Sequence, residues 1–216
     1  MKIRPSNTRG YIPRSHLDKD NYQSYRSFSC MSYQDPNYSG WGPIKTINDD
    51  RTRPGFITAW HEHKHLDIIN YMIKGKCRHR DNIGNDNTAS HNQVQHFWCG
   101  SSIWHELSNE TDQDARYLQI WIEPNVVVSD LTPSYDFFTR EPGFNKLPIE
   151  FKNTKIEVYA GNLDQNCLTK NSYLLILEGE CYVNNVKLSE GDAVDIYNEV
   201  LIQPQGSPHI ILFELL

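Results

Sequence analysis

The chain has 216 residues, a formal net charge of −6 and a pI near 5.8. This length can bury the core of one large all-β domain or of two small ones. The evenly spread acidic charge excludes the basic surface that proteins use to bind nucleic acids or anionic membranes directly. We therefore expect no nucleic-acid or membrane partner, while binding to another protein remains open.

The five cysteines are scattered along the chain and form no Cys-x-x-Cys pair. They match no disulfide framework of a small secreted domain. The first twenty residues lack the apolar core of a signal peptide, and no apolar run is long enough to cross a bilayer. The expected location is the cytoplasm, with the thiols reduced.

Short apolar or alternating runs recur along the chain, as is typical of strands. The first half contains IKTIN (44–48), FITAW (56–60), DIINYMIK (67–74), VQHFWC (94–99) and YLQIWIE (117–123). The second half contains KIEVYA (155–160), YLLILEGECYV (173–183), DAVDIY (192–197) and HIILFEL (209–215). Turn-forming stretches separate these runs, and no segment shows a long helical period, although 129–153 has room for a short helical turn. The chain is predicted to be an all-β sandwich or barrel.

A weak internal repeat suggests how the strands are grouped. YMIKGKCRHR (71–80) resembles LILEGECYVN (175–184), and each stretch is a strand that runs through a glycine into a second strand. Such a repeat predicts a duplicated β-barrel unit. We expect the join in EPNVVVSDLTPSYDFF (123–138), which gives an N-terminal domain over 1–127 and a C-terminal domain over 128–216.

The stretch AWHEHKHLDIINY (59–71) places His61, His63 and His65 at every second position. On a strand these side chains share one face. Such an arrangement is rarely useful for packing, because neutral imidazoles need hydrogen-bond partners and charged ones repel each other. A metal ion is the sharper interpretation, but His61 and His65 would lie about 13 Å apart. At most two of the three can share one ion, so a complete site needs further ligands.

The best additional candidate is His105, in CGSSIWHELSNE (99–110). Glu106 follows it directly, and Asp67 follows the three histidines. An HxH pair with a distant histidine and a carboxylate is a nitrogen and oxygen ligand set. It suits Fe(II), Mn, Ni, Cu or Zn, and it does not choose among them.

Several segments together resemble the pirin family. They are YRSFSCMSYQDPNYSGWGPIKTINDD (25–50), HEHKHLDIINYMIKGKCRHRDNIGN (61–85), GSSIWHELSN (100–109) and YLQIWIEP (117–124), and the resemblance covers roughly residues 20–125. It implies a bicupin with two antiparallel jelly-roll β-barrels. The first barrel would carry one divalent transition metal, with Fe(II) as the first candidate, and the second would be degenerate.

Carried over position by position, the resemblance assigns His61 and His63 to the family's HxH ligands and His105 to its third histidine. The family's carboxylate, two residues after the third histidine, is replaced here by Leu107. Glu106 is the nearest substitute, both as a fourth ligand and as the catalytic carboxylate, although a regular strand would point it to the opposite face unless a bulge intervenes. Asp67 or a water molecule are the alternatives.

The remaining histidines and tryptophans receive less specific roles. His65 is expected beside the site rather than on the metal. The tryptophans expected to touch a ligand are Trp60 and Trp104. The histidines expected to be satisfied strand or surface residues without a metal are His79, His91, His96 and His209.

Two functions of different class follow from the resemblance. One is an oxygenase of the quercetin 2,3-dioxygenase type, acting on a small aromatic, flavonol-like substrate. The alternative is a metal-dependent coregulator without turnover, which binds a partner protein. A third possibility is a metal-free cupin with a structural or partner-binding role.

Overall fold

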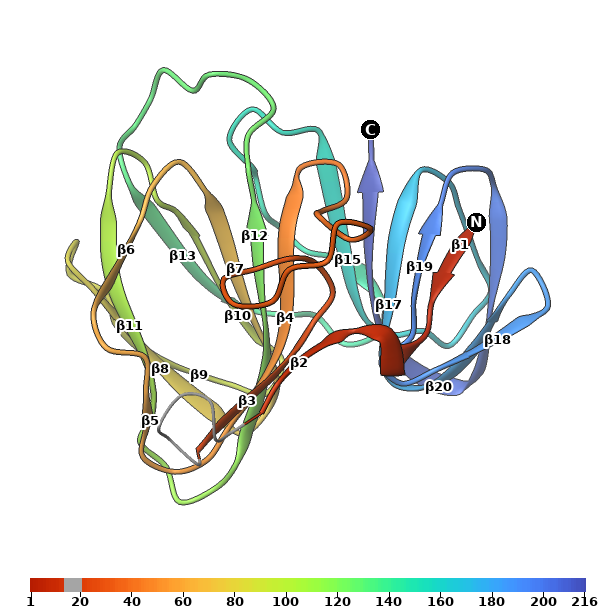
Figure 1. Cartoon of the computed structure of the whole chain (residues 1–216), viewed down its shortest axis with the longest axis horizontal. Helices are drawn as coiled ribbons and strands as arrows, with labels where there is room; N and C mark the ends of the chain where they lie inside the picture. The colour runs from red at the N-terminus through yellow and green to blue at the C-terminus, as the bar shows by residue number, and fades with distance from the viewer. Residues whose placement is uncertain (14–20) are drawn as a thin grey trace. The chain divides into compact units, whose positions relative to one another are not determined.

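The computed structural model describes residues 1–13 and 21–216, and these residues are almost entirely strand and loop (Figure 1). One 3-10 turn, η1 (Ser6–Thr8), is the sole helical element among them. The strands in the first half are β1 (Lys2–Arg4), β2 (Gly10–Ile12), β3 (Tyr22–Arg26), β4 (Ile44–Thr52), β5 (Phe56–Ile57), β6 (His61–His63), β7 (Asp67–Lys74), β8 (Lys76–Asp81), β9 (Asp86–Ser90) and β10 (Gln93–Trp98). The later strands are β11 (Ile103–Asn109), β12 (Ala115–Ile122), β13 (Ser134–Thr139), β14 (Asn145–Lys146), β15 (Ile156–Asn162), β16 (Cys167–Thr169), β17 (Ser172–Val183), β18 (Val186–Ser189), β19 (Ala193–Ile196) and β20 (Val200–Leu215).

This architecture confirms the all-β, antiparallel prediction. The allowance for a helical turn within 129–153 was wrong, because this segment holds β13 and β14 instead. Across the described ranges, no helix is long and apolar enough to cross a membrane.

The chain forms two compact units. The N-terminal unit contains Gly10–Thr139 and Phe151–Thr154, and the C-terminal unit contains Met1–Arg9, Arg140–Glu150 and Lys155–Leu216. This partition differs from a boundary between 127 and 128 in three places, one of which is the assignment of Phe151–Thr154 to the N-terminal unit. β1 pairs with β19 and so belongs to the C-terminal unit, whereas β13 pairs with β10 and belongs to the N-terminal one.

Two sheets make up the N-terminal unit. The larger has the order β13-β10-β7-β12-β4-β3-β2, and the smaller has the order β5-β11-β8-β9 with β6 added beside β11. Both sheets contribute to one buried apolar cluster, formed by Met72, Cys77, Ala89, Leu107, Ala115 and Tyr117. A second cluster joins Ile68 and Phe97 of the larger sheet to Cys99 and Ile103. The two sheets are thus packed against each other through their inner faces.

The C-terminal unit is built on one sheet, with the order β1-β19-β17-β20-β15-β14 and with β16 and β18 paired to β20 and β17. The pairing of β17 with β20 shifts register around Glu178, next to Gly179. These irregularities bend the two long strands, so that residues from both halves of β17 and β20 reach one core. That core contains Leu163, Leu174, Ile176, Cys181, Val183, Leu188, Val194, Ile196, Val200, Ile202, Ile210 and Leu212. The degeneracy of this second unit stays a prediction.

The two glycines of the internal repeat have the same backbone conformation. Gly75 has φ +72° and Gly179 has φ +81°. Both lie in the left-handed region that side chains disfavour. In addition, a Cβ at Gly75 would lie 2.5 Å from the carbonyl oxygen of Asp114 and 2.8 Å from Cα of Ala115.

Gly75→Ala is therefore expected to lower the free energy of unfolding by about 3 kcal/mol, because backbone strain and steric overlap act together. The matched control is Gly55→Ala, since Gly55 has φ +80° but no described atom within 4 Å of the added Cβ. Strain alone should cost the control about 1 kcal/mol. Urea denaturation of both variants checks the difference, and equal losses would contradict the packing assigned to Gly75.

One buried carboxylate in the N-terminal unit makes stability depend on pH. Asp50 on β4 is buried and accepts a 2.8 Å hydrogen bond from the Tyr22 hydroxyl. Burial raises the pKa of Asp50 to about 6, although Arg26 and the Tyr22 hydroxyl act in the opposite direction. The folded state therefore holds its proton to higher pH than the unfolded chain does, and stability falls as the pH rises through this interval.

Asp50→Asn should remove this fall in stability with rising pH, because asparagine does not titrate. Relative to the variant, the wild-type free energy of unfolding should fall by roughly 2 kcal/mol between about pH 4 and pH 7. Urea denaturation of both proteins at the two pH values measures the difference. Parallel pH profiles for the two proteins would show that Asp50 titrates normally in the folded state.

Candidate metal centre

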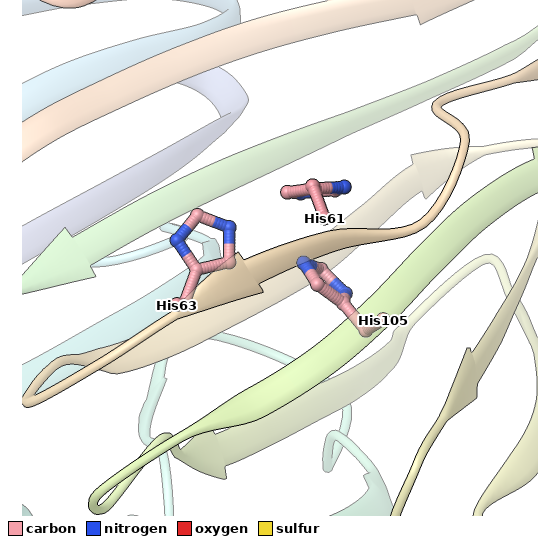
Figure 2. A group of neighbouring side chains, drawn as sticks. All are labelled: His61, His63 and His105. Atoms are coloured by element: carbon pink, nitrogen blue, oxygen red, sulfur yellow. The ribbon is translucent and has the colours of Figure 1, made fainter.

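Antiparallel pairing of β6 with β11 brings together histidines that are distant in the sequence. In this register His61 lies opposite His105, and His63 lies opposite Ile103. Because side chains alternate along a strand, His61, His63 and His105 project to the same face of the smaller sheet. Figure 2 shows the three imidazoles gathered above these two strands.

The three imidazoles are close enough to share an ion. One potential ligand atom of each histidine lies within 4.8 Å of the others. The ring centroids are 4.9 Å apart for His61 and His63, and 4.4 Å apart for His61 and His105. Two nitrogens that bind one ion lie at most about 4.2 Å apart, so small side-chain adjustments would close the site.

The free ring nitrogens fit such an ion. Nε2 of His63 and Nε2 of His105 are buried and have no hydrogen-bond partner in the described part of the chain. His61 Nδ1 lies 3.0 Å from the carbonyl oxygen of Ala59, which leaves its Nε2 for a ligand. Ala59 has φ +59°, so a sparsely populated backbone conformation directs this carbonyl. Unpaired buried nitrogens are costly unless something binds them, and a cation meets that need.

The electrostatics keep the imidazoles of His63 and His105 neutral. Burial, aided by the neighbouring His61, lowers the pKa of His63 to about 4. Burial and the surrounding histidines hold the pKa of His105 well below its usual range. The neutral imidazole is the form that binds a metal, so both groups are ready to bind at neutral pH without losing a proton.

Another buried histidine, His79, contacts His105. His79 Nδ1 is 3.4 Å from His105 Nδ1, and His79 Nε2 is 3.0 Å from Oδ2 of Asp81. Burial alone would raise the pKa of Asp81, but hydrogen bonds from His79 and Asn85 hold it below its usual value. His79 was expected to be a satisfied strand histidine, and it is satisfied, but its partners are Asp81 and His105.

Glu106 does not join the three histidines. It lies opposite Arg80 in the pairing of β11 with β8, and its Oε1 accepts hydrogen bonds from Arg80 Nε at 2.8 Å and from Arg80 Nη2. No bulge interrupts this part of β11, so alternation directs Glu106 away from His105. Leu107 is on the side of His105 and packs in the apolar cluster with Met72.

Asp67, the other carboxylate considered, is also occupied elsewhere. It is fully buried on β7, and its Oδ1 lies 2.8 Å from His96 Nε2. Its Oδ2 accepts a hydrogen bond from the backbone N–H of Lys152 at 3.1 Å. Asp67 and His96 thus tie the 151–154 segment to the larger sheet within the N-terminal unit.

The remaining aromatic residues are distributed differently from the expectation. Trp60 and Trp104 are each 44% exposed, and Trp104 alternates with the buried Ile103 and His105, so it points away from the cluster. Trp121 lies closer, with its ring 4.8 Å from that of His63. Trp121 is not among the tryptophans that the sequence predicts to touch a ligand.

Three further histidines, His65, His91 and His209, are not part of the cluster. His65 is exposed with φ +55°, because β6 ends at His63 and the alternation ends with it. The ring of His91 has its Nδ1 2.6 Å from the carbonyl oxygen of Ile73. His209 is buried on β20 in the C-terminal unit.

His79 and Asp81 were the functional candidates that sequence reasoning missed. Their signal is the alternation in CRHRD, which places both side chains on the buried face of β8. That signal alone does not reveal which histidine lies opposite, because the pairing of β8 with β11 is a long-range feature.

Comparison with known proteins places the chain among proteins of one family. The pirin family model matches residues 6–122. A pirin-like protein from Caulobacter vibrioides is 33% identical, with 81% of this chain and 83% of that protein covered. A quercetin 2,3-dioxygenase from Escherichia coli K12 is 25% identical, with 99% of this chain and 97% of that protein covered.

Solved structures show the same fold. The bacterial pirin YhhW from Escherichia coli, in complex with nickel(II), superposes with a TM-score of 0.89 at 24% identity, with 99% of this chain and 98% of that chain covered. The all-β prediction and the recognised resemblance are thereby confirmed. The chain belongs to the pirin family.

Proposed function

We propose that His61, His63 and His105 hold one divalent transition metal through their Nε2 atoms. The observation that carries this proposal is the pair of buried Nε2 nitrogens on His63 and His105, which lack a partner among the described residues and lie within reach of His61. The nickel(II) complex of a bacterial pirin supports a metal in a protein of this fold. A ligand set of three imidazoles accepts Fe(II), Mn, Ni, Cu or Zn, and Fe(II) is the cofactor we propose first.

The activity we propose is that of a quercetin 2,3-dioxygenase-type oxygenase, acting on a small aromatic, flavonol-like substrate. A relative similar over nearly the whole chain carries that name. When bound, the ion supplies Lewis-acid chemistry at a substrate oxygen, with coordination positions that three ligands leave open. The chain itself contributes neutral imidazoles, and the ring of Trp121 against His63 limits water on one side.

The second candidate is a metal-dependent protein without turnover that binds a protein partner. The arrangement of Glu106 favours it, since this carboxylate is ion-paired with Arg80 rather than directed to the histidines. Glu106 would have to leave Arg80 to act as the base that takes a substrate proton or as a fourth ligand. We propose the three-histidine site without Glu106.

We also propose that the protein works in the reducing environment of the cytoplasm. All five cysteines are free thiols, and four of them are buried. Burial raises the pKa of Cys77 to about 12, which makes this thiol unreactive.

Wild-type protein reconstituted with Fe(II) or Ni(II) and then desalted is expected to retain about one equivalent of metal. His105→Ala should abolish retention, because it removes a ligand from a set of three. Glu106→Gln should retain as much metal as the wild type, and His65→Gln is the matched histidine control, since His65 is exposed. Metal analysis by mass spectrometry measures all four proteins. Loss of metal in Glu106→Gln, or retention in His105→Ala, would overturn the assignment.

Aerobic incubation of the metal-loaded protein with quercetin distinguishes the two functions. The oxygenase proposal predicts loss of the flavonol absorbance and release of carbon monoxide, and it predicts that His105→Ala is inactive. If Fe, Mn, Ni and Cu forms that each hold metal all leave quercetin intact, the quercetinase activity is excluded. The second candidate would then be preferred.

A further inference from the structure

His105 is connected through His79 to a buried carboxylate. The His105 and His79 Nδ1 atoms are 3.4 Å apart, and His79 Nε2 lies 3.0 Å from Asp81 Oδ2. The side chains of His79 and Asp81 are fully buried. The pairing of β11 with β8 fixes this series of hydrogen-bonded side chains, because His105 lies opposite Asp81 and Leu107 lies opposite His79.

Asp81 is held in place by the turn that follows it. Its Oδ1 accepts the backbone N–H groups of Ile83 at 3.1 Å and Asn85 at 2.9 Å. Its Oδ2 accepts the side-chain amide of Asn85 at 2.8 Å as well as His79. Every one of these contacts needs an acceptor, and an ionised carboxylate is an acceptor only. The turn therefore fixes Asp81 as an anion whose oxygen points at His79.

The proton positions of both histidines follow from this anchor. Because Asp81 only accepts, His79 Nε2 must donate and carry a hydrogen. A neutral His79 then has an acceptor at Nδ1, so the facing Nδ1 of His105 must donate. A neutral His105 with its hydrogen on Nδ1 has a free lone pair at Nε2, the buried nitrogen for which the described ranges offer no hydrogen-bond partner.

We propose that Asp81 and His79 are positioning residues that hold His105 in the Nδ1–H tautomer, so that its Nε2 is presented to the metal. The inference rests on the proposed metal site. The relay also places a buried negative charge behind a ligand set composed of neutral imidazoles. A hydrogen-bonded carboxylate in this place orients the ligand ring and increases its basicity.

A purely structural role for His79 is the competing account. Its ring lies 5.0 Å from the ring of Phe97 and is stacked 5.0 Å from that of Tyr135, so it also fills space in the core. The two accounts differ in what a substitution that preserves shape should do. Packing alone would be kept by an aromatic ring at position 79, whereas the relay needs a hydrogen-bond acceptor that faces His105 Nδ1.

Asp81→Asn tests the anchor. The variant keeps an oxygen for the turn but replaces the acceptor that faces His79 with an N–H donor. His79 then accepts at Nε2 and donates at Nδ1, which drives the hydrogen of His105 to Nε2 and blocks ligation. A comparable amide substitution in a serine protease leaves the geometry intact and holds the histidine in the wrong tautomer. Ni(II) affinity, measured by competition with a chelator, should fall by about 10- to 100-fold.

Asp86→Asn is the matched control. Asp86 lies on the same hairpin, but it is exposed and pairs with Arg78. Its Ni(II) affinity should equal that of the wild type. A wild-type affinity in Asp81→Asn would overturn the proposal.

Two substitutions of His79 separate positioning from packing, and they keep the test available if Asp81→Asn does not fold. His79→Phe keeps the ring but loses both hydrogen bonds, and its Ni(II) affinity should fall as in Asp81→Asn. In His79→Asn, the side-chain oxygen takes roughly the place of the ring Nδ1 and still accepts from His105, so this smaller residue should retain more of the affinity. Thermal unfolding reports on the fold of each variant. The opposite order, with His79→Phe binding better than His79→Asn, would support packing instead.

Nitrogen-15 NMR of the metal-free protein reads the tautomer directly. The wild type should show His105 with its hydrogen on Nδ1, and Asp81→Asn should show it on Nε2. If the wild type shows this tautomer but binds no Ni(II), the relay stands and the metal proposal fails. If Ni(II) binds while His105 carries its hydrogen on Nε2 before loading, the relay is overturned and the metal proposal stands.

Discussion

The antiparallel register between β6 and β11 is the constraint on which the candidate site depends. It places His61 opposite His105, and the alternation of side chains then fixes which neighbours face the cluster. His63 joins the cluster because it is two residues from His61, and Glu106 is excluded because it is one residue from His105. A slip of one residue in the pairing of β6 with β11 would turn Trp104 and Glu106, instead of His105, toward His61 and His63.

Hydrogen bonding at the back of two of these imidazoles complements this register. Ala59 engages Nδ1 of His61, and His79 engages Nδ1 of His105, so the opposite nitrogens are left to face one another. Burial keeps His63 and His105 neutral, which removes the repulsion that three close imidazolium groups would suffer. Leu107, two residues after His105, belongs to the apolar cluster between the two sheets rather than to the ligand set. The ring nitrogens that could bind an ion are thereby brought close together.

Much of this arrangement could be predicted from sequence. The alternation of HEH predicts two histidines on one strand face, and the resemblance to the pirin family supplied His105 as their partner. The direction of Glu106 follows from the same alternation once β11 is known to be regular. The pairing of Arg80 with Glu106 and the approach of His79 to His105 depend on the register of β8 with β11, which no local pattern encodes. The place of Met1–Arg9 in the C-terminal unit was missed for the same reason, since it rests on long-range pairing with β19.

The most direct test is the crystal structure of the protein loaded with Ni(II), with anomalous scattering used to locate the ion. Our account predicts one ion about 2.0–2.2 Å from Nε2 of His61, His63 and His105, with Glu106 still paired to Arg80. An ion bound through Nδ1 of His105, held by Glu106, or found away from these three histidines would contradict it.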